Sequence, residues 1–197
     1  MTDERDKQDY IDKKYHYASA RGRGKEFAET VYKLILKDEY SLPTHPQYLA
    51  LGAGFATPEI EFVKQLKLEP SNVYLLDLLY KSRVPDGILS QLEAVNIIPE
   101  GIFEFLEHSA QKYSFISAFG LEVTIADNID TLVPLFAKNL ENAGIVYIYP
   151  YSGRDANDLW LKHGFEAILP YPILHQGNFR PICYMYKGNS NVIEPKV

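Results

Sequence analysis

Short runs of mainly apolar residues alternate with stretches of helical periodicity along most of this sequence. The runs lie at 48–51, 73–77, 95–98, 113–119 and 145–149. A run that is apolar on both of its faces is typical of a strand buried inside a parallel sheet. Strands that alternate with helices therefore predict an α/β fold, with a mostly parallel sheet and helices on both of its faces.

The segments around these runs carry helix signals. Apolar residues recur at helical spacing in the first of them, which indicates a helix that ends before Pro43. Thr57 is expected to cap the next helix, with Pro58 in its first turn. Gly144 is expected to end a helix over 129–143, which tolerates Pro134 only in its first turn. The predicted helices are 27–35, 57–66, 83–92, 100–112, 129–143 and 155–163.

The C-terminal part has a different pattern. Two β-rich runs, 165–174 and 181–187, flank a segment, 175–179, with the composition of a hairpin loop. The chain thus reads as five β/α units followed by an antiparallel hairpin. We expect one domain over 25–190, preceded by a flexible polar arm (1–24) and followed by a short tail (191–197).

Composition excludes several classes of protein. No apolar stretch reaches the roughly 18 residues of a membrane helix, and the charged N-terminus lacks the apolar core of a secretory signal. A single cysteine, Cys183, excludes a disulfide framework, and the five scattered histidines do not form a metal motif. We therefore expect a cytoplasmic protein with no bound metal and no membrane partner.

The balance of charge bears on nucleic-acid binding. The net charge is −6, with 20 basic and 26 acidic residues, whereas proteins held to nucleic acid by their whole surface are usually basic. The exception is residues 13–25, which carry five cations and no acid. This basic segment can contact phosphates and stack bases, fold over a pocket as a lid, or be a solvated tail.

Two features stand at the predicted carboxyl ends of neighbouring strands, where ligands bind in sheets of this kind. Gly52 and Gly54 form a turn that lets a ligand approach the backbone, and the next helix directs its N-terminus to the same place. Asp77 can accept two hydrogen bonds from a ribose diol. Together they indicate a nucleoside-bearing cofactor, the alternative being a simple strand-to-helix turn. A dinucleotide fingerprint would need a third glycine where Thr57 stands.

On these residues the sequence resembles class I S-adenosylmethionine-dependent methyltransferases. The resemblance implies a Rossmann-like, three-layer sandwich with a mostly parallel seven-stranded sheet whose last strand is antiparallel, and S-adenosylmethionine as cofactor. It extends over roughly residues 25–188 and rests on YLALGAGFA (48–56), VYLLD (73–77), VNIIPEGIFEFL (95–106), KYSFISAFGLEV (112–123), the helix and strand at 129–149, and LWLKHGFEAILPY (159–171).

Several positions depart from the family pattern. The acid that usually precedes the first glycine by two residues is Ala50, and the third glycine is Ala56. The acid expected on the adenine side falls at Gly101, with Glu100 beside it, and the acid that often opens the fourth strand is Ser114. The cofactor-binding residues that the resemblance implies are Gly52, Ala53, Gly54, Phe55, Asp77, Leu78, Glu100, Gly101, Ser117 and Phe119.

The substrate side should be formed by the exits of the fourth and fifth strands. Methyl transfer is an in-line displacement in which the protein supplies proximity and orientation, so no fixed catalytic signature is expected. Glu122 is a candidate base or cation clamp, with a solvated loop acid as the alternative. Tyr149 and Tyr151 are candidates to frame a flat or cationic substrate, with simple packing as the alternative.

Three functions follow from these observations. The first is methyl transfer to a small molecule or an exposed polymer group. The second is a binding or regulatory protein that kept the fold and lost turnover, and the third is a nucleic-acid-associated methyltransferase that uses the basic segment. Replacing Asp77 with alanine is predicted to weaken cofactor binding with little loss of fold.

Overall fold

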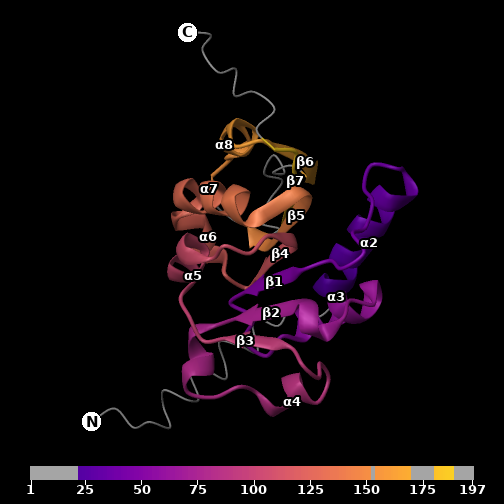
Figure 1. Ribbon diagram of the computed structural model, residues 1–197. Coiled ribbons are helices and arrows are strands. Elements are labelled where there is room, and N and C mark those ends of the chain that lie inside the picture. The colour runs from indigo at the N-terminus through magenta and orange to yellow at the C-terminus, as the bar shows by residue number, and fades with distance from the viewer. Residues whose placement is uncertain (1–21, 152–153, 170–179, 189–197) are drawn as a thin grey trace.

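The computed structural model describes residues 22–151, 154–169 and 180–188 (Figure 1). Its centre is one seven-stranded sheet in the order β3-β2-β1-β4-β5-β7-β6. The strands are β1 (Tyr48–Leu51), β2 (Val73–Leu76), β3 (Asn96–Ile98), β4 (Tyr113–Phe119), β5 (Leu140–Tyr151), β6 (Phe165–Leu169) and β7 (Arg180–Tyr186). The helices are α2 (Arg23–Leu36), α3 (Thr57–Leu66), α4 (Asp86–Leu89), α5 (Ile102–His108), α6 (Glu122–Asp127), α7 (Ile129–Asn139) and α8 (Asn157–Lys162).

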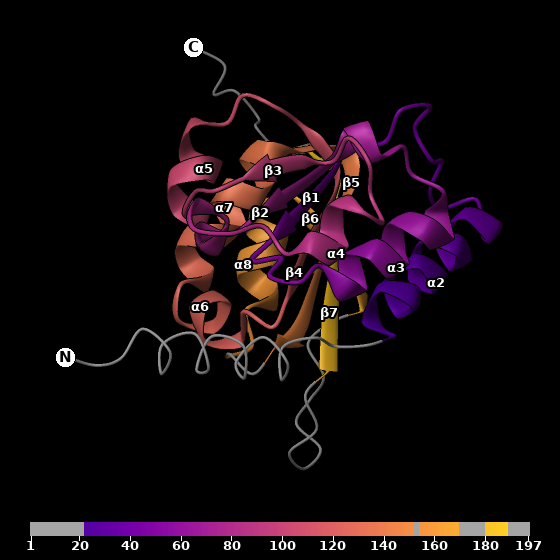
Figure 2. The same cartoon turned by 90° about the horizontal axis from the view of Figure 1, so that it is seen from below.

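Helices cover both faces of this sheet, as Figure 2 shows from below. On one face α2 and α3 form an aromatic core, in which Phe27 stacks on Phe62 with ring centroids 4.2 Å apart. On the other face α5, α7 and α8 pack around Trp160, which stacks on Tyr184 at 4.3 Å. The sheet is therefore the middle layer of a three-layer sandwich, as the alternating sequence pattern predicts.

The sheet carries the predicted mixture of strand directions. β3, β2, β1, β4 and β5 pair in parallel, while β7 is antiparallel to both β5 and β6. The predicted α/β sandwich with a mostly parallel sheet and an antiparallel last strand is confirmed. The hairpin loop expected at 175–179 lies outside the described residues.

The order of the strands determines where a ligand can bind. β1 pairs with β2 on one side and with β4 on the other, so the chain changes direction across the sheet beside β1. Leu51 is opposite Leu76 in β2 and Ala118 in β4. The segments that follow these strands, including Gly52 and Asp77, therefore meet at one edge of the sheet, next to the switch point.

Two helices differ from their prediction in detail. The helix expected over 129–143 ends at Asn139, because the Asn139 side chain donates to the carbonyls of Leu135 and Leu106, both at 2.8 Å, and the chain then extends. Pro134 lies beyond the first turn of α7, where it removes one backbone hydrogen bond. The N-cap of α3 is Ala56 in a left-handed conformation (φ 53°), not Thr57.

Other helices also begin or end at residues that differ from the prediction. The helix expected over 83–92 is confined to Asp86–Leu89, and that expected over 100–112 to Ile102–His108. At its N-terminus, α2 begins at Arg23, two residues before the predicted start of the domain. Most of the predicted arm and tail lie outside the described residues. Within the described part of the chain, every helix is too short or too polar to cross a lipid bilayer.

The early start of α2 depends on a close approach between two helices. A Cβ atom added to Gly24 would lie 1.7 Å from the carbonyl oxygen of Pro58 and 2.9 Å from the Cβ of Glu61. Only a residue without a side chain fits between α2 and the first turn of α3. This contact fixes α2 against the element that follows the glycine turn.

We predict that Gly24→Ala destabilises the fold, although alanine favours helices. The added methyl group meets backbone rather than a movable side chain, and overpacking of this kind costs roughly 1–3 kcal/mol. Gly87→Ala is the matched control, because Gly87 is also helical and a Cβ there has no atom within 4 Å. Urea unfolding should show a lower midpoint for the first variant only; equal midpoints would contradict the proposed close contact.

Candidate functional site

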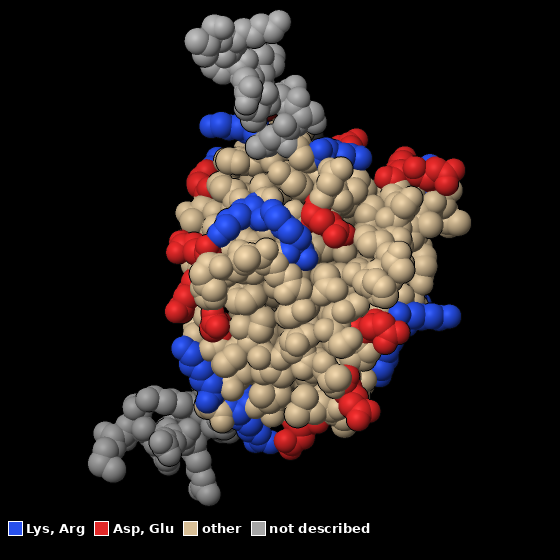
Figure 3. Space-filling view, in the orientation of Figure 1, with Lys and Arg blue, Asp and Glu red and all other residues tan. Residues whose placement is uncertain are grey.

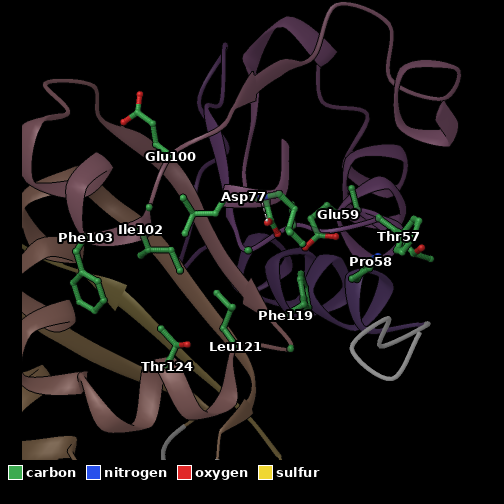
Figure 4. A pocket seen from close by; sticks show the side chains of 18 of the residues that line it. Thr57, Pro58, Glu59, Asp77, Glu100, Ile102, Phe103, Phe119, Leu121 and Thr124 are labelled. Atoms are coloured by element: carbon green, nitrogen blue, oxygen red, sulfur yellow. Dashed lines mark hydrogen bonds between the residues drawn. The ribbon is translucent and has the colours of Figure 1, made fainter. Parts of the chain in front are cut away.

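A cavity of about 640 Å³ opens at the carboxyl ends of β1, β2 and β4 (Figure 4). Its volume lies within the roughly 300–1,000 Å³ of small-molecule sites. Among the described residues, four acids and no Lys or Arg line it. The lining residues are Gly52, Ala53, Phe55, Ala56, Thr57, Pro58, Glu59, Asp77, Leu78, Leu79, Glu100, Gly101, Ile102, Phe103, Glu104, Phe119, Gly120, Leu121 and Thr124.

The glycine turn after β1 forms one wall of this cavity. Gly52 and Gly54 have φ values of 61° and 52°, in the left-handed region that glycine adopts without strain. The amide of Ala53 donates to the carbonyl of Leu76 at 3.1 Å, and that of Ala56 closes a turn on the carbonyl of Ala53. The turn is thereby fixed to the end of β2.

Asp77 holds the turn from the other side. Its Oδ2 accepts a hydrogen bond from the amide of Gly54, and its Oδ1 accepts one from the amide of Leu79, both at 2.9 Å. The side chain is almost fully buried. A carboxylate has about four acceptor positions, so Asp77 can accept from a ligand as well as from the protein.

Because of these hydrogen bonds, we expect Asp77→Ala to lower the stability of the fold. The variant would leave the amides of Gly54 and Leu79 without their acceptor, and each buried donor left unsatisfied costs roughly 1–3 kcal/mol. Asp77 therefore supports the fold, and the expectation of little loss of fold is not consistent with the structure.

The side chain of Leu121 occupies the space beside Gly52 that the sequence predicts to be open to a ligand. A strand that ends in glycine predicts open backbone at this position, but a Cβ on Gly52 would lie 2.6–2.8 Å from three carbon atoms of the Leu121 side chain. Leu121 follows β4 and lines the same cavity. The space next to the backbone of Gly52 is thus filled by this apolar side chain, which separates Gly52 from part of the cavity.

Glu59 is a lining residue that the sequence patterns did not single out. An acid in the first turn of a helix is common, since it interacts favourably with the helix dipole. Here the side chain is only 1% exposed, and its Oε2 has no hydrogen-bond partner within the described part of the chain. Burial, followed by the nearby charges of Asp77 and Glu61, raises the pKa of Glu59 to about 8. Its own backbone amide partly opposes this shift.

The far side of the cavity is more apolar. Ile102 and Phe103 come from the start of α5, and Gly101 precedes them. Figure 4 shows the carboxylate of Glu100 directed away from Asp77. The same carboxylate lies 3.3 Å from Nε2 of His108. Glu100 therefore contributes to the wall of the cavity while its charged end faces α5.

The structure brings most of the predicted cofactor-binding residues together. Gly54 and Ser117 are the exceptions, since neither lines the cavity. Gly54 has its amide on Asp77, and its carbonyl accepts from the hydroxyl of Tyr80 at 2.7 Å. Ser117 is fully buried within β4, and its hydroxyl bonds to that of Tyr48 at 2.6 Å. The residues that do line it are Gly52, Ala53, Phe55, Asp77, Leu78, Glu100, Gly101 and Phe119.

The candidate substrate-side residues have different surroundings. The Arg23 guanidinium lies 4.0 Å from the ring centre of Tyr149 and donates to its hydroxyl at 3.1 Å. The hydroxyl of Tyr151 donates to the carbonyl of Arg154, and the ring is buried, so this residue packs. Glu122 begins α6, but its side chain lies outside what the structure describes.

Little of the basic segment at 13–25 belongs to the described residues. Arg23 pairs with Glu26, and Lys25 lies 3.9 Å from Glu29. On the face shown in Figure 3, described residues of both charges are interspersed, and the lower middle of the face is mostly uncharged. The arrangement of these two cations is that of a helix surface with intrahelical ion pairs.

The described residues contain no candidate metal site and no thiol suited to act as a nucleophile. No group of three His, Cys, Asp or Glu side chains there is placed to hold a metal ion. Cys183 is fully buried in β7, and burial raises the pKa of its thiol. A thiol with a raised pKa is a poor nucleophile at neutral pH.

Known structures share this architecture. An amino pentose methyltransferase from Micromonospora echinaspora, solved with S-adenosylmethionine bound, aligns over 88% of this chain and 95% of its own, with a TM-score of 0.60 and 10% identity. An S-adenosylmethionine-dependent methyltransferase from Clostridium acetobutylicum aligns over 94% and 100%, with a TM-score of 0.57 and 11% identity. The CcbJ methyltransferase from Streptomyces caelestis aligns over 84% and 90%, with a TM-score of 0.54 and 14% identity.

This chain has the class I methyltransferase fold. No protein-family model matches the sequence, and no curated protein matches it either. At identities of 10–14% the likeness is one of fold, and the side chains that line the cavity are this chain's own. Within the methyltransferase fold, the cavity lies at the switch point beside β1, where the glycine turn and Asp77 meet.

Glu59 gives the stability of this methyltransferase fold a predicted pH dependence. Its pKa in the folded protein, about 8, exceeds the ordinary value of 4.5. The folded state therefore favours the protonated acid, and its stabilising effect is present below pH 4.5 and is lost as the pH rises toward 8. We expect Glu59→Gln, which stays neutral, to become progressively more stable than wild type over this range.

Thermal unfolding from pH 4.5 to 8.5 measures this difference. The free energy of unfolding of wild type should fall relative to the variant by up to about 1.4 kcal/mol for each unit of pKa shift. Glu104→Gln is the control, because Glu104 lines the same cavity but is exposed. A difference between wild type and Glu59→Gln that stays constant with pH would show that folding does not raise the pKa of Glu59.

Proposed function

We propose that this protein is an S-adenosylmethionine-dependent methyltransferase. The observation that carries the proposal is the cavity beside the glycine turn, whose described lining residues include four acids and no Lys or Arg. Such a lining favours an adenosyl ligand with positive charge. The likeness of fold to methyltransferases, one of them solved with this cofactor bound, supports the same choice.

The residues present fit the parts of this cofactor. Asp77 stands at the end of β2 with acceptor positions suited to the hydroxyls of a ribose. Leu78, Ile102 and Phe103 offer apolar contacts suited to a flat base. Glu59 adds a buried carboxyl whose Oε2 has no hydrogen-bond partner among the described residues. When ionised, the Glu59 carboxylate would attract a ligand that carries an ammonium and a sulfonium group.

The same lining argues against a dinucleotide. A pyrophosphate needs backbone amides or cations to offset its charge. Here the amides of Gly54 and Leu79 are bonded to Asp77, and the cavity offers acids in place of cations. Repulsion between a pyrophosphate and these carboxylates disfavours nicotinamide and flavin dinucleotides.

The reaction needs little chemistry from the protein. The cofactor supplies an activated methyl group when bound, and the chain's residues hold the reactants in line and exclude water. Asp77 and the glycine turn fix the adenosyl end, while Phe119 and Leu121 provide an apolar wall. Tyr149, held by Arg23, stands at the exit of β5 on the expected substrate side. The acceptor is a small molecule or an exposed group of a polymer.

We predict that S-adenosylmethionine and S-adenosylhomocysteine raise the melting temperature of the protein. A ligand at 100 times its dissociation constant stabilises a protein by about 2.7 kcal/mol. Differential scanning fluorimetry with both compounds, and with NAD as the contrasting ligand, tests the choice of cofactor. A shift with NAD alone, or no shift at millimolar adenosyl compound, would overturn the proposal.

Asp77→Ala should weaken binding of adenosyl compounds and also lower the melting temperature. The variant loses the hydrogen bonds to the ribose, and bonds to a charged group are worth roughly 1.5–3 kcal/mol each, so we expect the dissociation constant to rise at least tenfold. Isothermal titration below the melting temperature of the variant separates the two effects. Glu93→Gln, which changes an exposed acid that does not line the cavity, should bind as wild type does, and normal affinity of Asp77→Ala would refute the ribose assignment.

Two observations favour a second candidate, a binding protein of the same fold without turnover. The Leu121 side chain fills the space next to Gly52, and Ala50 stands where the family pattern has an acid. Both features reduce the contacts that the turn can make with a cofactor. Absence of a thermal shift with either adenosyl compound favours this alternative.

A further inference from the structure

Glu59 is a buried acid with an incomplete set of partners. It is the third residue of α3, it is 1% exposed, and its Oε2 has no hydrogen-bond partner in the described part of the chain. A carboxylate without a partner is very costly to bury, so such groups either pair or remain protonated. The side chain also lines the 640 Å³ cavity. A ligand in this cavity would therefore lie next to a carboxyl group whose hydrogen-bonding capacity the described residues do not use fully.

The groups that face Glu59 from the described parts of the chain do not supply a positive charge. They are Asp77 after β2, Glu61 on α3 itself and the phenol of Tyr48 on β1. Two of these are acids, and the third is neutral at physiological pH. The residues that the structure describes in the walls of the cavity likewise include no Lys or Arg. These side chains thus disfavour an ionised Glu59 while no cationic ligand is present, and its own backbone amide offsets their effect only in part.

We propose that Glu59 is a proton-linked cation site, which keeps its proton in the ligand-free protein and releases it to solvent when a positively charged group of the ligand enters. The inference rests on the proposed function, since it takes the ligand to be an adenosyl compound. The raised pKa of the side chain agrees with it. In the balanced step the acid loses one proton to the buffer, and the resulting carboxylate pairs with the cation.

The position of Glu59 indicates which group it meets. In Figure 4, Ile102 and Phe103 lie on one side of Asp77, and Glu59 lies on the opposite side, toward Thr57 and Pro58. With the base against Ile102 and Phe103 and the ribose at Asp77, the amino-acid end of the ligand extends toward Glu59. The α-ammonium group of that end is the cation that we assign to this carboxylate.

Proton release can be measured directly by isothermal titration. The binding enthalpy is determined at pH 7 in two buffers with different enthalpies of ionisation, and the difference gives the number of protons released. S-adenosylhomocysteine carries the ammonium group, whereas 5′-methylthioadenosine has the same nucleoside and thioether without it. We expect about one proton released with the first ligand, from the ionisation of one acid, and none with the second.

Glu59→Gln provides the matched variant. It should bind S-adenosylhomocysteine without proton release and about tenfold more weakly, as expected for the loss of one charge-assisted contact. Its affinity for 5′-methylthioadenosine should not change. Should the variant fail to fold, the wild type still tests the idea, because its proton release should decline between pH 7 and 8.5 as Glu59 ionises before the ligand arrives.

The outcomes separate the two proposals. Binding of S-adenosylhomocysteine without proton release, or with release that persists in Glu59→Gln, overturns the role of Glu59 and leaves the proposed function standing. Release with S-adenosylmethionine but not with S-adenosylhomocysteine overturns the assignment to the ammonium, since the sulfonium is then the partner. If no adenosyl compound binds, the proposed function fails, and the inference that rests on it fails too.

Discussion

The two hydrogen bonds accepted by Asp77 hold together the part of the molecule on which the site depends. One carboxylate oxygen is bonded to the amide of Gly54 and the other to the amide of Leu79. A single side chain therefore joins the turn after β1 to the segment after β2. The cavity has a defined wall because these two loops, which are distant in sequence, cannot move independently.

The packing of helices reinforces this arrangement. Gly24 brings α2 into contact with Pro58 in the first turn of α3, and the aromatic core beneath these helices includes Phe27 and Phe62. α3 starts directly after the glycine turn, so its position determines where Glu59 enters the cavity. The fold thus places a buried acid beside Asp77, at a point where electrostatic repulsion makes a second negative charge costly.

Strand positions were the most predictable part of this fold. β1 and β4 have the predicted bounds, because a strand buried on both faces leaves an unbroken apolar run in the sequence. Helix ends were less predictable. Leu140 and Ala143 continue the apolar spacing of α7, yet they belong to β5, because the Asn139 side chain bonds to α5 and ends the helix. A contact between segments 33 residues apart leaves no local signal.

The site was predictable in position but not in detail. Gly52 and Asp77 follow two adjacent buried strands, and the rule that ligands bind at strand ends is sufficient to bring them together. Spacing does not show which neighbouring side chain fills the space next to a glycine, so Leu121 could not be foreseen. Glu59 resembled any acid in a first helical turn, because burial is a tertiary property. Ser117 was expected at the cavity, but its side chain bonds to Tyr48 inside the sheet.

The reversed direction of β7 has a practical consequence for handling the molecule. Met185 is paired with Ile145, near the amino end of the parallel strands, whereas Arg23 contacts Tyr149 near their carboxyl end. The described ends of the chain thus leave the domain from opposite edges. A tether that follows Gly188 would start on the edge away from the cavity, so attachment to a sensor chip through that end would leave the cavity mouth turned toward solution.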